Sequence, residues 1–483
     1  MRTKYENTRR TKIVATMGPA SRTPERVREL ILAGVNVFRL NFSHGSHQEH
    51  FETFNTIRNT SAELGFPVAI LQDLSGPKLR ITNIKGEFAP IATGAKIEIA
   101  YLPLSSTADT ISTAERVVIQ TVNPADFLKI GERVLLADGI LELVVEGVGK
   151  DTVQCSALRA SRIRSRVGIA FPDSRVSLPA TTSKDLEDFA WGLKHDVDYV
   201  AVSFVQNAND LLNLRTIMAQ HKSEVKLIAK IERPVALDNI NEILDASDGL
   251  MVARGDLGLE LPLEKVPQIQ TKLIELCNDR GIPVIVATQM LSSMVTSTRP
   301  TRAEVTDVSF AVTSGADAVM LSEETAIGEH PAACVDYLNR IAIEAEQSLV
   351  RGEAALRSRK QDRLSISDAV AYAACAAAVK IQPAAIVSCT ATGTAARLVS
   401  KYRPEAPIFG VSNVDGTLRR MGLMWGVIPL KAEVASAQND EIDQAVGMVK
   451  QVGNFRSGSR VIVTGGRVVQ NPGSTSRLEI REL

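Results

Sequence analysis

Several features that would point to a membrane, secreted or zinc protein are missing from this 483-residue sequence. No apolar run has the length of a membrane span, and the alanine-rich stretch 369–379 is too short. No signal-peptide core follows the basic first residues. The five cysteines are scattered, and neither HExxH nor CxxC occurs. We therefore expect reduced thiols, a cytoplasmic location, no zinc and no membrane partner.

An excess of charge of one sign is also missing. Lys plus Arg and Asp plus Glu both number 55, so the formal net charge is zero. Nothing in this balance favours binding to nucleic acid or to an anionic membrane surface. No GKS/T P-loop motif occurs, which argues against an ATP site of that type. With 45% apolar residues, the chain has the composition of a globular protein of two to four domains.

What the sequence does contain is a repeating unit in which a short apolar run ends in polar or charged residues. Helical patterns such as 24–33, 184–194 and 265–280 lie between these runs, and strand-then-helix repeated in this way predicts a (β/α)8 barrel. The eight predicted strands cover residues 12–18, 35–41, 67–74, 197–204, 225–232, 248–255, 282–289 and 316–324. The strand ends of such a barrel meet at one face, which carries the active site. The residues predicted at that face are Arg39, Asn41, Asp73, Lys230, Glu232, Arg254, Asp256, Thr288 and Glu324.

Two other segments depart from the barrel pattern. Residues 76–171 alternate at period two between turn signals, which predicts a small inserted β-barrel able to act as a lid. After residue 350 a new pattern of strands and helices predicts an open, mostly parallel α/β sheet. We therefore expect barrel segments at 1–75 and 172–350, a β lid at 76–171 and a C-terminal α/β domain at 351–483.

Carboxylates and a lysine follow two neighbouring predicted strands. Lys230 and Glu232 alternate along one strand and so share a face, and Asp256 follows the next strand. Two carboxylates at adjacent strand ends, with room for water and substrate oxygens, predict a Mg²⁺ or Mn²⁺ site. A plain salt bridge between Lys230 and one carboxylate is the alternative.

Further groups suited to anions lie at the same predicted face. Free N–H groups at Gly255 and Asp256 could hold a carboxylate or phosphate, although a simple turn explains them equally well. Thr288 could position a water molecule or relay a proton, or merely cap a helix. Arg39 is suited to bidentate phosphate binding.

Oxygen donors also gather after the second and third predicted strands. Asn41, Ser43 and Asp73 together resemble a monovalent-cation site. For His44 alone, ordinary hydrogen bonding is the simpler interpretation.

A Thr-rich turn in the C-terminal segment could form a second phosphate site. Its hydroxyls and N–H groups lie between a predicted strand and helix, and Arg467 could face them. A plain helix start is the alternative. The residues that would contact the phosphate are Thr390, Thr392, Gly393, Thr394 and Arg467.

In this order, the motifs closely resemble those of the pyruvate kinase family over nearly the whole chain. The motifs are KIVATMGPAS, VFRLNFSHG, QDLSGPKLR, LPATTSKD, IAKIE, VARGDLGLE, ATQML, RPTRAEVTDV and DAVMLSEETAIGEHP. The resemblance implies Mg²⁺-dependent phosphoryl transfer from phosphoenolpyruvate to ADP, giving pyruvate and ATP. It also implies a homotetramer.

Residue roles follow from the resemblance. Glu232 and Asp256 would hold the metal, while Lys230 and Arg39 would contact the transferring phosphoryl group. Gly255, Asp256 and Thr288 would bind the substrate carboxylate, with Thr288 aiding protonation of the enolate. The residues that would face the nucleotide phosphates are Asn41, His44, Arg80 and Lys184.

Two departures from the family pattern are visible. Potassium-dependent members have a Thr where this chain has Leu74 and a Glu where it has Lys78. The remaining residues of that cation site would be Asn41, Ser43 and Asp73. Because the Lys78 ammonium can replace the charge of the ion, we predict that K⁺ is not required. Glu323 stands where the family usually has Gly, with no evident effect.

The C-terminal segment resembles the family's effector-binding domain, which implies activation by a phosphorylated sugar or a nucleotide monophosphate. A metal-dependent lyase or aldolase acting on pyruvate or phosphoenolpyruvate, with Lys230 as a Schiff-base former, remains an alternative. A non-enzymatic metabolite sensor is a third, although the catalytic side chains are all present.

Overall fold

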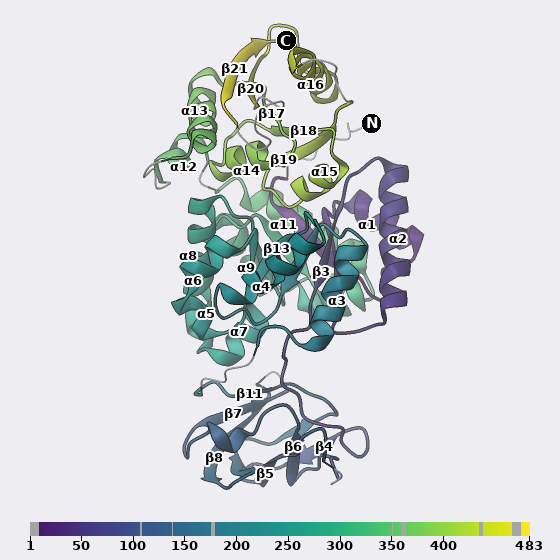
Figure 1. Ribbon diagram of the computed structural model, residues 1–483, viewed down its shortest axis with the longest axis vertical. Coiled ribbons are helices and arrows are strands. Elements are labelled where there is room, and N and C mark those ends of the chain that lie inside the picture. The colour runs from purple at the N-terminus through teal and green to yellow at the C-terminus, as the bar shows by residue number, and fades with distance from the viewer. Residues whose placement is uncertain are drawn as a thin grey trace.

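The fold is taken from a computed structural model of the chain. It describes residues 9–106, 109–137, 139–174, 179–349, 351–358, 364–433, 438–465 and 475–483. Figure 1 shows three bodies along the long axis, with the barrel in the middle, the β-rich insert at one end and the C-terminal sheet at the other.

Eight parallel strands close into the central barrel. They lie in the order β1-β16-β15-β14-β13-β12-β3-β2. Most of their residues are apolar, because a barrel strand is buried on both faces. Their bounds are β1 Lys12–Thr16, β2 Val37–Asn41, β3 Ala69–Asp73, β12 Tyr199–Val202, β13 Lys226–Ile231, β14 Gly249–Ala253, β15 Val284–Ala287 and β16 Ala318–Leu321. Each lies inside a predicted run, so the (β/α)8 prediction is confirmed.

Helices surround the barrel. Three of them, α2, α3 and α9, begin with a capping box, in which an N-cap hydroxyl and an acidic third residue satisfy the free N–H groups. The helices are α1 Pro24–Ala33, α2 His47–Leu64, α3 Ser183–Lys194, α4 Asn209–Gln220, α5 Pro234–Asp238, α6 Ile240–Ala246, α7 Arg254–Glu260, α8 Val266–Arg280, α9 Arg302–Thr313, α10 Glu323–Ala326 and α11 Pro331–Ala345. Short 3₁₀ turns occur at η2 Leu263–Lys265 and η3 Ser292–Val295.

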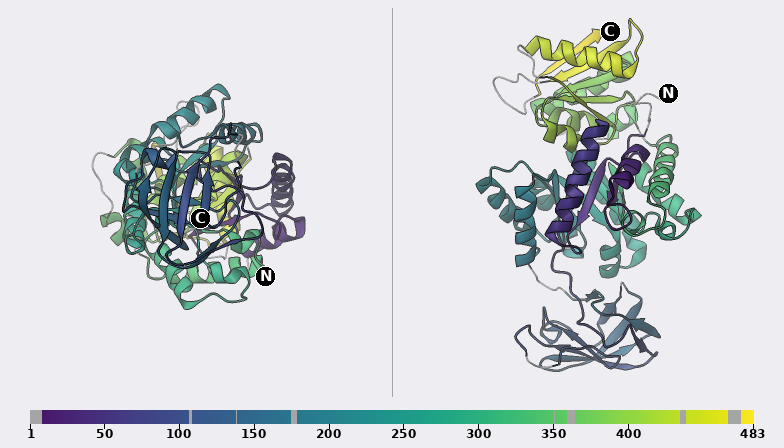
Figure 2. Two further views of the ribbon diagram at one scale, coloured as in Figure 1. Left: turned by 90° about the horizontal axis from the view of Figure 1, so that it is seen from below. Right: turned by 90° about the vertical axis from the view of Figure 1, so that its right-hand side faces the viewer.

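Among its described residues, the elements of the insert between β3 and α3 are strands and one 3₁₀ turn, η1 Pro124–Asp126. A six-stranded sheet has the order β11-β7-β8-β9-β5-β6, and β10 pairs with β4. The strands are β4 Ala89–Ile91, β5 Lys96–Tyr101, β6 Arg116–Ile119, β7 Arg133–Leu136, β8 Leu141–Val148, β9 Thr152–Ala157, β10 Ser161–Ile163 and β11 Ile169–Ala170. The insert has its own buried apolar cluster, and Figure 2 shows it separated from the barrel by thin connections.

One of these connections is fixed by Gly76. Its φ of +66° lies in the left-handed region, and an added Cβ would stand 2.7 Å from both Ser203 and Phe204. Its N–H donates to the Asp185 carboxylate at 3.0 Å. Only glycine fits this position, so the entry to the insert is held against the start of α3.

The C-terminal part forms a five-stranded sheet in the order β19-β18-β17-β20-β21, with only β21 antiparallel. Its helices lie on both sides of the sheet (Figure 1). The elements are α12 Gly352–Ser358, α13 Ile366–Ile381, β17 Ala385–Cys389, α14 Thr394–Lys401, β18 Ile408–Ser412, α15 Asp415–Met421, β19 Val427–Lys431, α16 Gln438–Gly453, β20 Arg460–Gly465 and β21 Arg477–Glu482. The predicted α/β architecture is confirmed.

The C-terminal sheet closes the N-terminal end of the barrel. Leu423 belongs to the apolar cluster inside the barrel, and the Tyr199 hydroxyl donates to the Arg420 carbonyl at 2.7 Å. The Lys12 ammonium donates to the Val427 carbonyl at 2.7 Å, and burial lowers the pKa of Lys12 to about 7. The open end of the barrel is therefore the opposite one, where the insert stands.

Within the described part of the chain, no helix is both long and apolar enough to cross a membrane.

Candidate active site

Lys230 forms the centre of a charged cluster at the open end of the barrel. Its ammonium lies 3.1 Å from a carboxylate oxygen of Asp73 and 3.0 Å from one of Glu232. The Lys230 side chain is 11% exposed and the two carboxylates are 1% exposed. Strand alternation brings Lys230 and Glu232 together, and Asp73 comes from the end of β3. The salt bridge between Lys230 and a carboxylate, predicted from the sequence as the alternative to a functional site, is therefore present.

Arg39 is the second cation of this cluster. Its Nε donates to the other oxygen of Asp73 at 2.6 Å, and its Nη1 donates to the Thr16 hydroxyl at 3.1 Å. Asp73 thus holds Arg39 and Lys230 side by side. Two cations fixed on one buried carboxylate form a preorganised site for an anion.

Ser203 is a member of the cluster that was not predicted from the sequence. Its hydroxyl accepts from the Lys230 ammonium at 2.6 Å and donates to the Leu74 carbonyl at 2.7 Å. The available signal was its position directly after β12, the same rule that identified the other strand-end residues. A serine gives no charge signal, so this rule alone did not single it out.

The pKa shifts follow from burial and from the pairing of charges. Burial opposes ionisation of Asp73, but Lys230 and Arg39 outweigh it and lower its pKa. Burial would likewise lower the pKa of Lys230, but Asp73 and Glu232 outweigh it and raise that pKa. Burial, with help from Asp256, raises the pKa of Glu232 despite Lys230. Lys230 is therefore firmly protonated at neutral pH.

The donor set at Glu232 and Asp256 suits a hard divalent cation. The Lys78 ammonium lies 2.8 Å from an oxygen of Asp256, and the Lys230 ammonium binds Glu232, so each carboxylate already attracts a cation. Among the described residues, no three His, Cys, Asp or Glu side chains converge as a metal site. Two carboxylates with positions left for substrate oxygens and water fit Mg²⁺.

Thr288 has an unusual backbone conformation after β15. Its φ is +73°, which a β-branched residue rarely adopts and which is typical of strained functional positions. Its hydroxyl accepts the Gly255 N–H at 2.8 Å and donates to the Ala287 carbonyl at 2.5 Å. The Thr288 hydroxyl and the Gly255 N–H, both expected to bind a substrate carboxylate, therefore lie together and are hydrogen-bonded to each other in this structure.

Two residues predicted at the mouth have structural contacts instead. Arg254, the first residue of α7, donates to the Asp307 carboxylate at 2.6 Å and to the Thr288 carbonyl at 2.7 Å. Glu324 in α10 accepts from the backbone N–H groups of Leu291 and Ser322. The prediction placed both at strand ends because their predicted strands ran too long.

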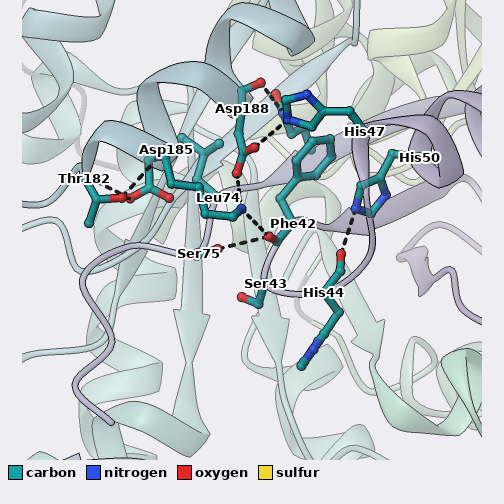
Figure 3. Close-up of polar contacts among 12 residues, drawn as sticks. Phe42, Ser43, His44, His47, His50, Leu74, Ser75, Thr182, Asp185 and Asp188 are labelled. Carbon is teal, nitrogen blue, oxygen red and sulfur yellow. Dashed lines mark hydrogen bonds and ion pairs between the residues drawn. The ribbon is translucent and has the colours of Figure 1, made fainter. Parts of the chain in front are cut away.

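The end of β2 and the turn after it contain three of the residues predicted to bind a monovalent cation or the nucleotide, Asn41, Ser43 and His44. The Asn41 side chain accepts the Ser43 N–H at 3.1 Å, and the His44 carbonyl lies 2.9 Å from a ring nitrogen of His50. Figure 3 shows the His44 ring pointing away from Phe42 and the histidines around it. The turn itself is fixed, while the His44 ring extends from it.

Lys184 and Arg80, both expected to face the nucleotide, lie on different elements. The Lys184 ammonium, from the first turn of α3, donates to the Phe42 carbonyl at 2.8 Å. Arg80, in the insert, donates to the Arg166 carbonyl at 3.0 Å. The structure thus brings Lys184 to the turn after β2, whereas Arg80 stays within the insert.

A cavity of about 620 Å³ lies between the insert and the open end of the barrel. Its lining includes Lys78, Asp256 and Glu260 on the charged side, with Phe171 and Phe204 as apolar walls. This volume is in the range of small-ligand sites.

The Thr-rich turn of the C-terminal part directly precedes α14. The Thr390 hydroxyl accepts the Gly393 N–H at 2.9 Å, and the hydroxyls of Thr392 and Thr394 lie 3.0 Å apart. Gly393 has a φ of +87°. Arg467, which was expected to face this turn, lies outside the described residues.

Comparison with known proteins agrees with this architecture. Residues 8–335 match the family model described as "Pyruvate kinase, barrel domain", and residues 368–481 match "Pyruvate kinase, alpha/beta domain". A protein named pyruvate kinase from Geobacillus stearothermophilus is 39% identical over 98% of this chain and 80% of its own length. One from Staphylococcus aureus strain MRSA252 is 39% identical, and one from Staphylococcus epidermidis strain RP62A is 38% identical, over the same shares. The chain therefore belongs to the pyruvate kinase family of phosphotransferases.

Proposed function

We propose that the open end of the barrel transfers a phosphoryl group from phosphoenolpyruvate to ADP, with Mg²⁺ or Mn²⁺ as cofactor. The observation that carries this proposal is the Lys230 ammonium held between Asp73 and Glu232 beside Arg39. Phosphoryl transfer needs alignment and neutralisation of spread negative charge more than covalent help. A pair of fixed cations next to metal-binding carboxylates supplies that environment.

Lys230 and Arg39 would contact the transferring phosphoryl group from two sides. Asp73 keeps both cations in place, and these two cations offset its own negative charge. Thr288 and the N–H groups of Gly255 and Asp256 would take the substrate carboxylate, exchanging their present mutual bond for bonds to its oxygens. The Thr288 hydroxyl would then orient the water that protonates the enolate carbon.

Glu232 and Asp256 would hold the metal. When bound, Mg²⁺ would supply positive charge that offsets the negative charge of the substrate. The ammonium of Lys78 pairs with Asp256, which supports this carboxylate as a cation ligand. On the nucleotide side we assign Asn41, His44, Arg80 and Lys184 to the phosphates of ADP. For Arg80 this assignment requires movement of the insert toward the barrel.

Glu232→Gln is expected to weaken metal binding. The substitution keeps the shape and an acceptor for the Phe204 N–H, which now donates to Glu232 at 2.7 Å, but it removes the anionic ligand. We expect the dissociation constant for Mn²⁺ to rise by about 10- to 100-fold, the range seen when metal-site partners are lost. Titration of free Mn²⁺ by electron paramagnetic resonance measures this without catalysis.

The matched control for this experiment is Glu264→Gln, which removes the same charge from an exposed position in η2. Equal Mn²⁺ affinity of the Glu232→Gln variant and this control would remove Glu232 from the metal site.

We also propose that the enzyme does not require K⁺. The Leu74 side chain is buried and has no oxygen, and both oxygens of Asp73 are already used by Arg39 and Lys230. In the present conformation the Lys78 ammonium pairs with Asp256 and not with Asn41 or Ser43. Its positive charge therefore lies beside the proposed metal ligands.

A phosphorylated sugar or nucleotide monophosphate is proposed as an activator at the Thr390–Thr394 turn, within a homotetramer. Thr392, Gly393 and Thr394 line a cavity of about 920 Å³ between α14 and the N-terminal end of the barrel. Phosphoenolpyruvate saturation is expected to be sigmoidal and to become hyperbolic with the activator. Hyperbolic curves under all such compounds, or a molar mass below four chains by light scattering, would contradict this assignment.

The lyase alternative has less support. A Schiff-base lysine needs an unprotonated amine, and enzymes obtain it by lowering the pKa. Asp73 and Glu232 raise the pKa of Lys230 instead. Borohydride trapping in the presence of pyruvate separates the two activities.

A further inference from the structure

Asp188 is a buried carboxylate at the contact between α2 and α3, outside the cluster around Lys230. Its side chain is 3% exposed. One oxygen lies 2.7 Å from Nε2 of His47, and the other lies 2.5 Å from the ammonium of Lys184, one helical turn away. Figure 3 shows the His47 ring directed at this carboxylate.

Lys184 is thereby held in one place although its side chain is 57% exposed. The ammonium binds Asp188 on one side and the Phe42 carbonyl, at 2.8 Å, on the other. The same carbonyl accepts the Ser75 hydroxyl at 3.1 Å. An ammonium has three donors, so these two contacts leave one N–H for a ligand.

Asp188 is itself fixed by two elements of the barrel. His47 is the first residue of α2, so its ring ties the carboxylate to that helix. The Asp188 carbonyl accepts the Gln72 amide at 2.7 Å, and Gln72 precedes Asp73 on β3. Gly192 makes room for this contact, since a Cβ there would stand 2.0 Å from Oε1 of Gln72. The position of Asp188 is therefore set by the same strand that carries Asp73.

We propose that Asp188 is the positioning residue of the nucleotide site, which orders the Lys184 ammonium for a phosphate of ADP. This inference rests on the proposed role of Lys184 in binding the nucleotide. A free lysine side chain samples many rotamers, and losing them on binding reduces affinity. Asp188 holds the Lys184 side chain in one position before the ligand binds. That position lies beside the segment that contains Asn41, Ser43 and His44.

The test is a double-mutant cycle on steady-state kinetics with varied ADP. Lys184→Gln is expected to raise KM for ADP by about tenfold or more, the effect of losing a charged hydrogen bond. Asp188→Asn, which keeps the shape, is expected to raise it by roughly fivefold, because an amide orders the ammonium less well than a carboxylate. In both variants KM for phosphoenolpyruvate, which binds at the cluster around Lys230, is expected to stay within about twofold.

The decisive outcome is the double variant. If Asp188 acts through Lys184, adding Asp188→Asn to Lys184→Gln changes KM for ADP by less than about twofold. Multiplied effects, or an unchanged KM in Asp188→Asn alone, would overturn the inference while leaving Lys184 in the nucleotide site. An unchanged KM in Lys184→Gln would instead remove the proposed role of Lys184. Glu187→Gln, an exposed charge removal on the same helix, is the control expected to match wild type.

A second route tests the same idea if Asp188→Asn does not fold, as judged by its melting temperature. His47→Ala removes the ring that fixes Asp188 and is expected to raise KM for ADP by about twofold, whereas His47→Gln keeps an N–H donor and is expected to restore it. Equal KM values in His47→Ala and wild type would contradict the inference.

Discussion

Lys230→Met is expected to lower kcat by about 10³-fold, the upper end of the loss seen when one preorganised electrostatic group is removed. Methionine matches the length of the lysine stem but brings no charge to the phosphoryl group. The loss is expected in kcat more than in KM for ADP, because Lys230 lies with Asp73 and Glu232 and makes no contact with Asn41, His44 or Lys184.

The same substitution is expected to reduce stability. It leaves Asp73 and Glu232 buried with one cation fewer, and breaking a buried ion pair costs about 3–5 kcal/mol. Arg39 still pairs with Asp73, so the cost falls mainly on Glu232, whose pKa is already raised. Thermal unfolding monitored beside the assay separates loss of fold from loss of chemistry.

A matched control for Lys230 exists on the same strand. Lys226 begins β13 at the closed end of the barrel, where it lines the cavity beside the C-terminal part. Lys226→Met removes an equal charge and, assayed without the proposed activator, is expected to keep kcat within about twofold. A Lys230→Met enzyme that folds and turns over like this control would exclude Lys230 from the reaction.

The second large effect concerns potassium. Replacing K⁺ by a bulky organic cation at constant ionic strength is expected to change the wild-type rate by less than about twofold, because the charge is already supplied by Lys78. The double variant Leu74→Thr with Lys78→Glu restores the residues of potassium-dependent relatives. It is expected to lose on the order of 10²-fold without K⁺ and to recover when KCl is added.

Lys85→Glu is the control for this charge reversal, since it lies in the insert at an exposed position. We expect it to show neither the loss nor the recovery. A large rise of the wild-type rate with KCl would contradict potassium independence. A double variant that is equally active without K⁺ would show that Lys78 is not the replacement for the ion.

The barrel could be predicted from the sequence because its strands are mainly apolar runs that end in polar or charged residues. Strand alternation placed Lys230 and Glu232 on one face, and the barrel prediction placed Asp73 at the same end of the barrel. In the C-terminal part, the α/β pattern predicted after residue 350 agrees with elements such as α14 and β18. Where the apolar periodicity of a segment matches the positions that are buried, the element can be predicted from the sequence.

Partners of long side chains could not be predicted in this way. Lys78 reaches Asp256, Arg254 reaches Asp307, and Glu324 accepts backbone N–H groups, and the strand pattern indicated none of these partners. These contacts depend on which elements lie within reach in three dimensions. The proposed role of Asp188 was not predicted for the same reason. Its partner His47 lies on another helix, and its partner Lys184 lies a full turn away on the same helix.

The measurement that tests the account most directly is pyruvate formation from phosphoenolpyruvate and ADP with Mg²⁺, with and without K⁺, beside Lys230→Met. We predict turnover that needs Mg²⁺, does not need K⁺ and is lost in the folded variant. Absence of turnover in the wild-type enzyme under all these conditions, with phosphorylated sugars and nucleotide monophosphates also present, would contradict the proposed reaction.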